Sequence, residues 1–247
     1  MTGLDLNADL GEGMGADEAL LEIVSSASVA CGGHAGDDAT MRAAIRAAKA
    51  GGVTIGAHPG FADREHFGRR RLLLPPEELD TQVRGQVRRL MEIAEEEGAE
   101  VRYLKLHGAL ANMAAEEPAV AALCFASVEG LVADLGILAL DNSAQADVAE
   151  AMGFDVVREA YADRAYQPNG LLVPRSEPGA VLHDRHAIAA RAIRLAEKGE
   201  IVAIDGSVFP SSARSLCIHG DTPDAIEIAR HLRRSLGDAG IAIASAF

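Results

Sequence analysis

The stretch Val101–Gly108, VRYLKLHG, decides the fold, because a short apolar β-type run passes directly into polar residues and a glycine. The run GVTIGAHPG at 52–60 has the same design, and a helical pattern that opens near Pro75 and ends at Gly98 separates the two. Strand, helix and strand in this order predict a mostly parallel sheet, because parallel neighbours need a crossover connection.

The same alternation continues along the chain. Apolar runs typical of strands lie at 4–9, 27–31, 53–57, 101–106, 136–140, 154–159 and 215–218. Helical patterns lie between them, and Asp37 or Asp38 can cap the helix that stops at Gly51. No linker divides the chain, so we expect one α/β domain over residues 1–247 with about seven principal strands. Periodicity alone does not distinguish a closed barrel from an open, doubly wound sheet.

The composition excludes several classes of function. The chain has 23 Lys and Arg against 37 Asp and Glu, a net charge of −14, so neither nucleic acid nor an anionic membrane is an expected partner. Aromatic residues are 4% of the chain and tryptophan is absent, which argues against a stacking platform for single-stranded nucleic acid. The N-terminus has acids where a signal peptide carries bases, and Glu129 and Asp134 interrupt the most apolar stretch, 120–140.

The cysteines point to a reducing environment. Cys31, Cys124 and Cys217 form no CxxC pair, and their odd number and wide spacing argue against a disulfide framework or a structural zinc site. We therefore expect a cytoplasmic protein. Cys31 lies near His34, but a buried and inert thiol is a more ordinary interpretation than a nucleophile.

Polar residues gather where the predicted strands end. In a parallel fold the carboxyl ends of all strands share one face, which is where barrels and doubly wound sheets hold their active sites. Histidines take this position on four different strands, and a nearby glycine at each permits a tight turn and close ligand approach. The strand-end residues that we expect in one site are Asn7, Asp9, Glu12, Gly33, His34, His58, Lys105, His107, His219 and Asp221.

Motifs for phosphate are weaker. The sequence has no Gly-Lys dipeptide and hence no Walker A loop. Residues 11–16 loosely match a dinucleotide turn, but Asp9 and Glu12 would face an anionic pyrophosphate there. The run Arg69–Arg71 is either an exposed basic turn or a guanidinium fork for an anionic substrate group, with Arg69 as the candidate.

Several sequence blocks resemble the LamB/YcsF family. They run through nearly the whole chain in the family's order: DLNADLGEGMG (5–15), ACGGHAGD (30–37), GAHPGFAD (56–63), FGRR (67–70), KLHGALAN (105–112), PNGLLVPR (168–175) and CIHGD (217–221). The chain departs from the usual family pattern at Gly33, Leu106 and Ala111, where the family has Phe, Pro and Tyr, and in the region 62–67. These departures affect the shape of a pocket more than its polar groups, so they put substrate choice in question.

The resemblance implies a fold and an activity. It implies a seven-stranded parallel β/α barrel similar to glycoside hydrolase and deacetylase barrels. It also implies the A subunit of an ATP-dependent 5-oxoprolinase, which cleaves the lactam of 5-oxo-L-proline to L-glutamate with ATP as cosubstrate and 5-oxoprolinase subunits B and C as partners. A homo-oligomer is compatible with this assignment.

Within such a site, imidazoles can move protons in both directions near neutral pH. We expect Asp9 to act as a base or to orient a histidine, Lys105 and His107 to stabilise an oxyanion, and Arg69 to bind the substrate carboxylate. The further expected proton carriers are His34, His58 and His219, with Asp221 fixing a tautomer. The expected substrate-binding residues are Asn7, Glu12, Gly33 and Arg69.

Two other functions stay open. The residue types also suit a divalent metal bound by Asp9, His34 and His58, although we do not favour one, and a metal-dependent amide or sugar deacetylase would then follow. Alternatively, the chain is a non-catalytic subunit that binds and delivers the lactam. An assay with and without ATP and partner subunits separates these hypotheses.

Overall fold

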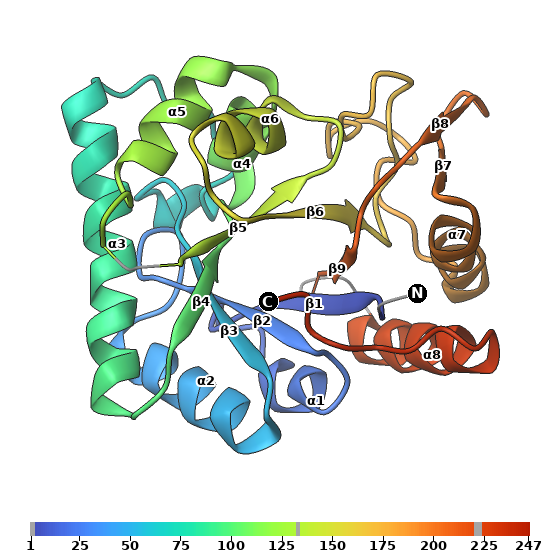
Figure 1. The fold of residues 1–247 in the computed structure, drawn as a ribbon, viewed down its shortest axis with the longest axis horizontal. Helices are drawn as coiled ribbons and strands as arrows, with labels where there is room; N and C mark the ends of the chain where they lie inside the picture. The colour runs from blue at the N-terminus through green and yellow to red at the C-terminus, as the bar shows by residue number, and fades with distance from the viewer. Residues whose placement is uncertain (1–2, 132–133, 220–223) are drawn as a thin grey trace.

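A closed barrel of parallel strands forms the centre of the molecule. The computed structural model describes residues 3–131, 134–219 and 224–247. The barrel strands follow one another in the order β1-β2-β3-β4-β5-β6-β9, and β9 pairs with β1 to close the ring, as the view in Figure 1 shows. They are β1 (Asp5–Leu10), β2 (Ser26–Ala30), β3 (Thr54–His58), β4 (Val101–Leu104), β5 (Gly136–Leu140), β6 (Val156–Tyr161) and β9 (Ser215–Ile218).

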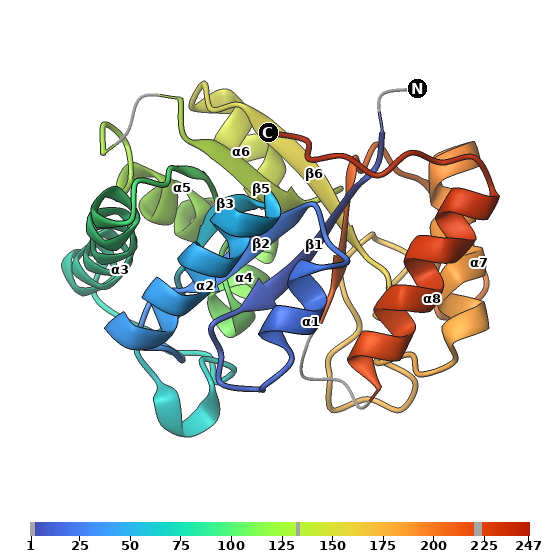
Figure 2. The same ribbon diagram turned by 90° about the horizontal axis from the view of Figure 1, so that it is seen from below.

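Helices cover the outside of the barrel. In Figure 2, α2 and α3 lie on one flank, and α7 and α8 pack side by side on the other. The helices are α1 (Asp17–Leu21), α2 (Asp38–Gly51), α3 (Pro76–Glu96), α4 (Gly108–Glu116), α5 (Pro118–Ala126), α6 (Ala144–Ala151), α7 (Arg185–Lys198) and α8 (Ala225–Asp238), with a 3-10 turn at Arg64–His66. Between α7 and β9, the antiparallel pair β7 (Glu200–Val202) and β8 (Val208–Pro210) stands apart from the barrel.

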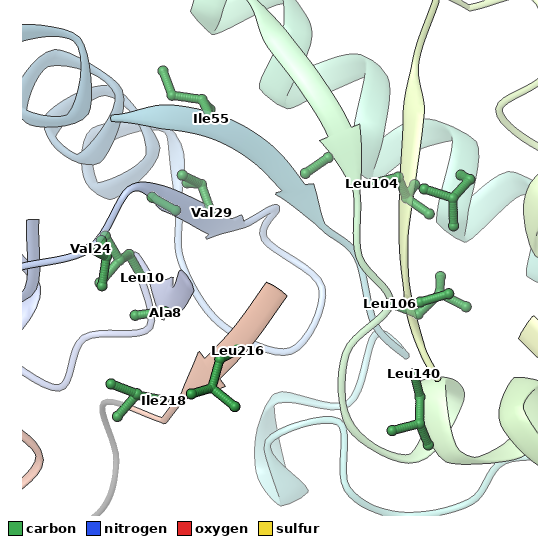
Figure 3. Close-up of a cluster of buried hydrophobic side chains, with 14 of the residues drawn as sticks. Ala8, Leu10, Val24, Val29, Ile55, Leu104, Leu106, Leu140, Leu216 and Ile218 are labelled. Carbon is green, nitrogen blue, oxygen red and sulfur yellow. The ribbon is translucent and has the colours of Figure 1, made fainter. Parts of the chain in front are cut away.

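The strands alternate between two environments. Along β1, Leu6, Ala8 and Leu10 belong to the apolar core between strands and helices, whereas Asp5, Asn7 and Asp9 are the intervening residues. Figure 3 shows Ala8 and Leu10 in the same apolar cluster as side chains from β2, β3 and β9. Because side chains alternate between the two faces of a strand, the polar residues of β1 line the lumen of the barrel.

The N-terminal end of the barrel is closed by the last residues of the chain. Phe247 stacks on Tyr103 at 4.5 Å between ring centroids, and both pack with Leu138 and Val157. The lumen is therefore sealed at the base, and its polar residues can meet ligands only at the carboxyl ends of the strands.

The predicted strands are confirmed, with ends that shift by up to two residues at most places. The closed barrel answers the question that periodicity left open, and Asp37 caps α2 through a capping box with Thr40. Helix α4 was not predicted; it starts at Gly108, directly after the strand-end residue His107. Among the described residues, no helix combines the length and apolar character needed to cross a membrane.

Candidate functional site

A buried lysine ammonium group lies at the centre of the upper lumen. Lys105 follows β4, and its Nζ lies 2.9 Å from Asp9 Oδ1 and 3.1 Å from Glu159 Oε1. It also donates to Asn7 Oδ1 at 3.2 Å and lies 3.0 Å from Cys217 Sγ. These acceptors come from β1, β6 and β9, so one cation joins strands across the lumen.

Electrostatics keep this cluster charged. Burial lowers the pKa of Lys105, but Asp9, Cys217 and Glu159 outweigh it and hold that pKa well above its ordinary value. Burial also opposes ionisation of Asp9, yet His58 and Lys105 bring its pKa well below the ordinary value. For Glu159, burial wins and raises the pKa, with Lys105 only partly compensating. Lys105 and Asp9 therefore form the ion pair of this lumen.

Two histidines next to this cluster are fixed by backbone carbonyls. His58, at the end of β3, donates from Nδ1 to the carbonyl oxygen of Lys105 at 2.8 Å. His107 donates from Nε2 to the carbonyl oxygen of Phe67 at 3.0 Å. The remaining nitrogens, His58 Nε2 and His107 Nδ1, lie 3.0 Å apart, and Asp9 Oδ2 lies 3.3 Å from His58 Nε2.

His34 and Glu12 form the outer part of this histidine cluster. His34 Nε2 lies 3.0 Å from Glu12 Oε1, and the His34 ring stacks on His107 with 3.6 Å between centroids and 7° between planes. Phe67 covers both rings edge-on at 5.4 Å. Burial lowers the pKa of His34 to about 3 and that of His107 well below its ordinary value, so both rings are neutral at pH 7.

The loop that carries Phe67 has an unusual backbone conformation where it packs against the histidine rings. Phe67 has a positive φ of 53°, which non-glycine residues rarely adopt, and Gly68 follows with a φ of 63°. A side chain at Gly68 would lie 2.8 Å from Cβ of His34, so only glycine fits against the ring. This strained turn aims the Phe67 carbonyl at His107.

A carboxylate–histidine pair stands on the other side of the lumen. His219, directly after β9, places Nδ1 2.9 Å from Asp163 Oδ1, and the Tyr161 ring stacks on it at 5.2 Å. Asp163 is buried; burial raises its pKa, but His219 and two arginines outweigh this and lower the pKa overall. Asp163 therefore accepts a hydrogen bond from His219 Nδ1–H. The other ring nitrogen of His219, Nε2, takes no part in this bond.

A cavity of about 400 Å³ opens over these groups. Asp9, His58, His107 and His219 line its floor, and Tyr161 lies beside them. Four arginines also line it: Arg69, Arg71, Arg164 and Arg175. Arg164 donates to backbone carbonyls, Arg71 pairs with Glu116, and Arg69 lies over the Phe67 ring. The cavity is large enough for a small anionic molecule.

The structure brings most of the predicted site residues together. Asp9, His34, His58, Lys105, His107 and Glu12 form one contiguous cluster, with His219 opposite and Arg69 at the rim. Asn7 lies deeper and bonds to Glu159 and Ser215, away from the cavity lining. Gly33 packs against Gln86 and lines a separate outer depression, so it does not join the cluster. Asp221 lies outside the described residues.

Several residues of the site were not predicted. Asp163 accepts from His219, and it lies in the irregular stretch between β6 and α7. Cys217 carries a signal that could have been used: in SLCIH, residues 215, 217 and 219 alternate toward the lumen. Lys105 corrects another expectation, because its ammonium is enclosed and does not line the cavity where an oxyanion would form.

Among the residues that the structure describes, two groups of side chains have donor atoms close enough to share a metal ion. One comprises Glu12, His34, His58 and His107, and the other Asp9, Cys217 and His219. In the second group, Lys105 Nζ already contacts Asp9 and Cys217, so an ion there would meet an ammonium group. The first group has no such cation between its nitrogen atoms. Our expected ligand set, Asp9, His34 and His58, matches neither group.

Fold and site together define a parallel β/α-barrel protein with a buried acid–base centre beneath a cavity of small-molecule size. The chain belongs to the LamB/YcsF family, whose model matches residues 4–247. The resemblance seen in the sequence blocks is thereby confirmed.

Relatives and structural neighbours agree with this assignment. The chain is 44% identical over 247 residues to a protein of Nitrobacter hamburgensis named as the A subunit of 5-oxoprolinase, covering 98% of this chain and 97% of the relative. It is 39% identical to the solved structure of a lactam utilization protein from Thermus thermophilus, with a TM-score of 0.92 and full coverage of both chains. At 14% identity, the fold alone is shared with a T48 deacetylase, at a TM-score of 0.51 over 98% of this chain and 88% of that one.

Proposed function

We propose that this chain is the A subunit of an ATP-dependent 5-oxoprolinase and that it carries out the ring opening of 5-oxo-L-proline to L-glutamate with subunits B and C. The names of its relatives support the enzyme, and one observation supports the chemistry. The same cavity is lined by a carboxylate-oriented histidine, His219, by the ion-paired Asp9 and by four arginines. A small lactam with a carboxylate needs both a proton acceptor and a cationic group.

The chemistry explains why ATP is coupled to so small a hydrolysis. A lactam is an unreactive amide, and transfer of the terminal phosphate of ATP to its carbonyl oxygen makes the carbonyl carbon a better electrophile. Water then adds to this carbon, the ring C–N bond breaks and the nitrogen takes up a proton, which leaves an acyl phosphate. A second water hydrolyses the acyl phosphate to the carboxylate and inorganic phosphate. Because the sequence has no Gly-Lys dipeptide, we assign ATP binding to the partner subunits and ring opening to this chain.

The residues that line the cavity suggest which group performs each part of the reaction. His219 is the candidate base for the attacking water, because Asp163 holds its Nδ1–H and leaves Nε2 to accept a proton. Arg69 and Arg175 are the candidates for the substrate carboxylate, since both line the cavity and are exposed. Asp163 is a positioning residue that acts through His219.

A coupled assay tests this function. Glutamate formation from 5-oxo-L-proline would be followed with ATP and purified subunits B and C, using wild-type chain and the variant His219→Ala. We expect a loss of at least about 100-fold in kcat/KM for His219→Ala, the lower range for removal of a general base. His66→Ala is the matched control, because His66 also pairs with an aspartate, Asp63 at 2.9 Å, but is not part of the cavity lining.

Other outcomes point to the other hypotheses. Amide or sugar deacetylation without ATP and partners would replace the proposal with a deacetylase. Lactam binding by this chain, with full turnover retained in His219→Ala, would leave a subunit that binds and delivers the substrate.

A further inference from the structure

The pair His58 and His107 has an unusual arrangement of hydrogens. Backbone carbonyls only accept hydrogen bonds, so His58 Nδ1 and His107 Nε2, which contact the carbonyls of Lys105 and Phe67, must both carry hydrogen. His58 Nε2 and His107 Nδ1 then face each other at 3.0 Å. Where neither of these two nitrogens carries a second hydrogen, their lone pairs repel unless a cation lies next to both.

A carboxylate completes this set of lone pairs. Glu12 Oε1 lies 3.5 Å from His107 Nδ1, and the donor atoms of Glu12, His58 and His107 all lie within 4.8 Å of one another. His34 donates to the same Glu12 oxygen at 3.0 Å. Histidine ligands of metal ions characteristically donate their other N–H to a backbone carbonyl, and ligating carboxylates are themselves hydrogen-bonded. Both features are present here.

We propose that Glu12, His58 and His107 bind one divalent transition-metal ion of the zinc type at the mouth of the barrel, with His34 as the residue that orients Glu12. Two metal–nitrogen bonds of about 2.1 Å at a right angle span about 3.0 Å, which matches the separation of His58 Nε2 and His107 Nδ1. The oxygen–nitrogen separation of 3.5 Å corresponds to an angle of about 113° at the same bond length.

The geometry also selects among the ligands. An ion lies in the plane of an imidazole that binds it, but the planes of His34 and His107 are nearly parallel, at 7°, with centroids 3.6 Å apart. One ion cannot lie in both planes, so His34 serves as an outer residue and not as a ligand. In the neighbouring group of Asp9, Cys217 and His219, the Lys105 ammonium supplies the positive charge. The lumen thus contains two cation positions, one occupied by a lysine.

Metal binding is measured without lactam, ATP or partner subunits, so the result is independent of the proposed function. The full chain would be stripped with a chelator and titrated with Zn²⁺ by calorimetry, and with Co²⁺ by visible absorption. We expect one ion per wild-type chain and Co²⁺ bands typical of nitrogen and oxygen ligands. His58→Ala and His107→Ala should each weaken Zn²⁺ binding at least about 100-fold, and Glu12→Gln at least about 10-fold.

Two control variants test whether the loss of Zn²⁺ binding is specific to this site. His34→Gln retains a donor for Glu12, so we expect a loss of no more than about 10-fold. The paired surface histidines His186 and His231, whose rings lie 4.6 Å apart on α7 and α8, offer an adventitious site. The double variant His186→Ala/His231→Ala should bind Zn²⁺ as the wild type does.

The proposal is overturned if wild-type chain binds no Zn²⁺, or if binding is lost in the surface variant and retained in His107→Ala. A strongly downfield proton resonance that persists with excess Zn²⁺ would show that the two histidines share a proton instead. Should His58→Ala or His107→Ala fail to fold, the wild-type protein still decides the question. Co²⁺ must then shift the imidazole resonances of His58 and His107 and leave those of His186 and His231 unchanged.

Discussion

The base and the mouth of the barrel lumen are both polar and both buried, yet they differ in how their polar groups are satisfied. At the base, Asp5 accepts from Ser25 and Ser26 through one oxygen and from Ser215 through the other. At the mouth, Lys105 pairs with Asp9. The base therefore stabilises its carboxylate with neutral hydroxyl groups, whereas the mouth uses a full positive charge.

This difference distinguishes buried polar groups that stabilise the fold from those that can bind a ligand. Every hydroxyl at the base has a partner within the same cluster, such as Ser28 with Tyr103 at 3.1 Å, and Phe247 separates Tyr103 from solvent. At the mouth, His34 Nδ1 is buried without a partner among the described residues, and nitrogens of two other rings face each other at 3.0 Å. Unsatisfied donors and acceptors beside a cavity indicate binding, whereas burial alone does not.

The largest expected effect is on the charge at the mouth. Lys105→Met removes the cation that joins Asp9, Glu159 and Cys217, and leaves the buried Asp9 carboxylate without its ammonium partner. We expect a loss of about 3–5 kcal/mol in the free energy of unfolding, measured by urea denaturation. Adding Asp9→Asn should recover part of it, because the unpaired charge is then removed. A loss below about 1 kcal/mol in Lys105→Met would mean that the charged groups at the mouth stabilise the fold no more than the neutral hydrogen bonds at the base do.

The second effect is on turnover. Asp163→Asn keeps an acceptor for His219 Nδ1 but removes its negative charge. We expect kcat/KM in the coupled assay to fall about 100-fold through kcat, with KM little changed, because Asp163 orients His219 and is not part of the cavity lining. A rise in KM that accounts for the whole loss in kcat/KM would show instead that Asp163 only shapes the binding pocket.

The same carboxylate predicts a dependence of stability on acid. The pKa of Asp163 lies below its ordinary value of 3.8 in the folded protein, so the unfolded chain binds its proton more readily. Its contribution is fully present above that ordinary value and is lost as pH falls through the folded pKa. The stability difference between wild type and Asp163→Asn should thus narrow below about pH 4, by no more than about 1.4 kcal/mol per pH unit. A difference that stays constant down to about pH 2 contradicts this assignment.

A smaller effect is expected at the base. Ser28→Ala removes the partner of the Tyr103 hydroxyl, which is fully buried. The expected cost is about 1 kcal/mol in the free energy of unfolding, with unchanged turnover, because this pair lies far below the cavity. Reduced turnover at normal stability would show that the base and the mouth are coupled.

The smallest expected effect concerns thiol chemistry. Burial raises the pKa of Cys31 and of Cys124 to about 12, so very little thiolate is present at about pH 8. Iodoacetamide should therefore leave both unlabelled in the folded protein and label both in guanidinium, as mass spectrometry would report. Rapid labelling of native Cys31 would revive the thiol nucleophile that we set aside.

Much of the fold could be predicted because strand and helix signals are local. The alternation of apolar runs and capped helices indicated the barrel strands, and polar strand ends indicated the site, from Asp9 to His219. Helix α4 was missed because its first residue, Gly108, is a helix breaker, and the preceding residue, His107, makes no side-chain cap hydrogen bond. Asp163 was missed because it reaches His219 from a loop, and loop conformation depends on contacts distant in sequence.

By itself, the sequence determined the family, the parallel architecture and the residue types that gather at one face, since all of these follow from local pattern. Only the tertiary structure decided which groups pair. It assigned Lys105 to the enclosed ion pair, Asp163 to His219, and the backbone carbonyls to His58 and His107. The reason is physical: a hydrogen bond or ion pair is gained or lost when the distance between its two atoms changes by a few tenths of an ångström. These distances are set only when the barrel closes.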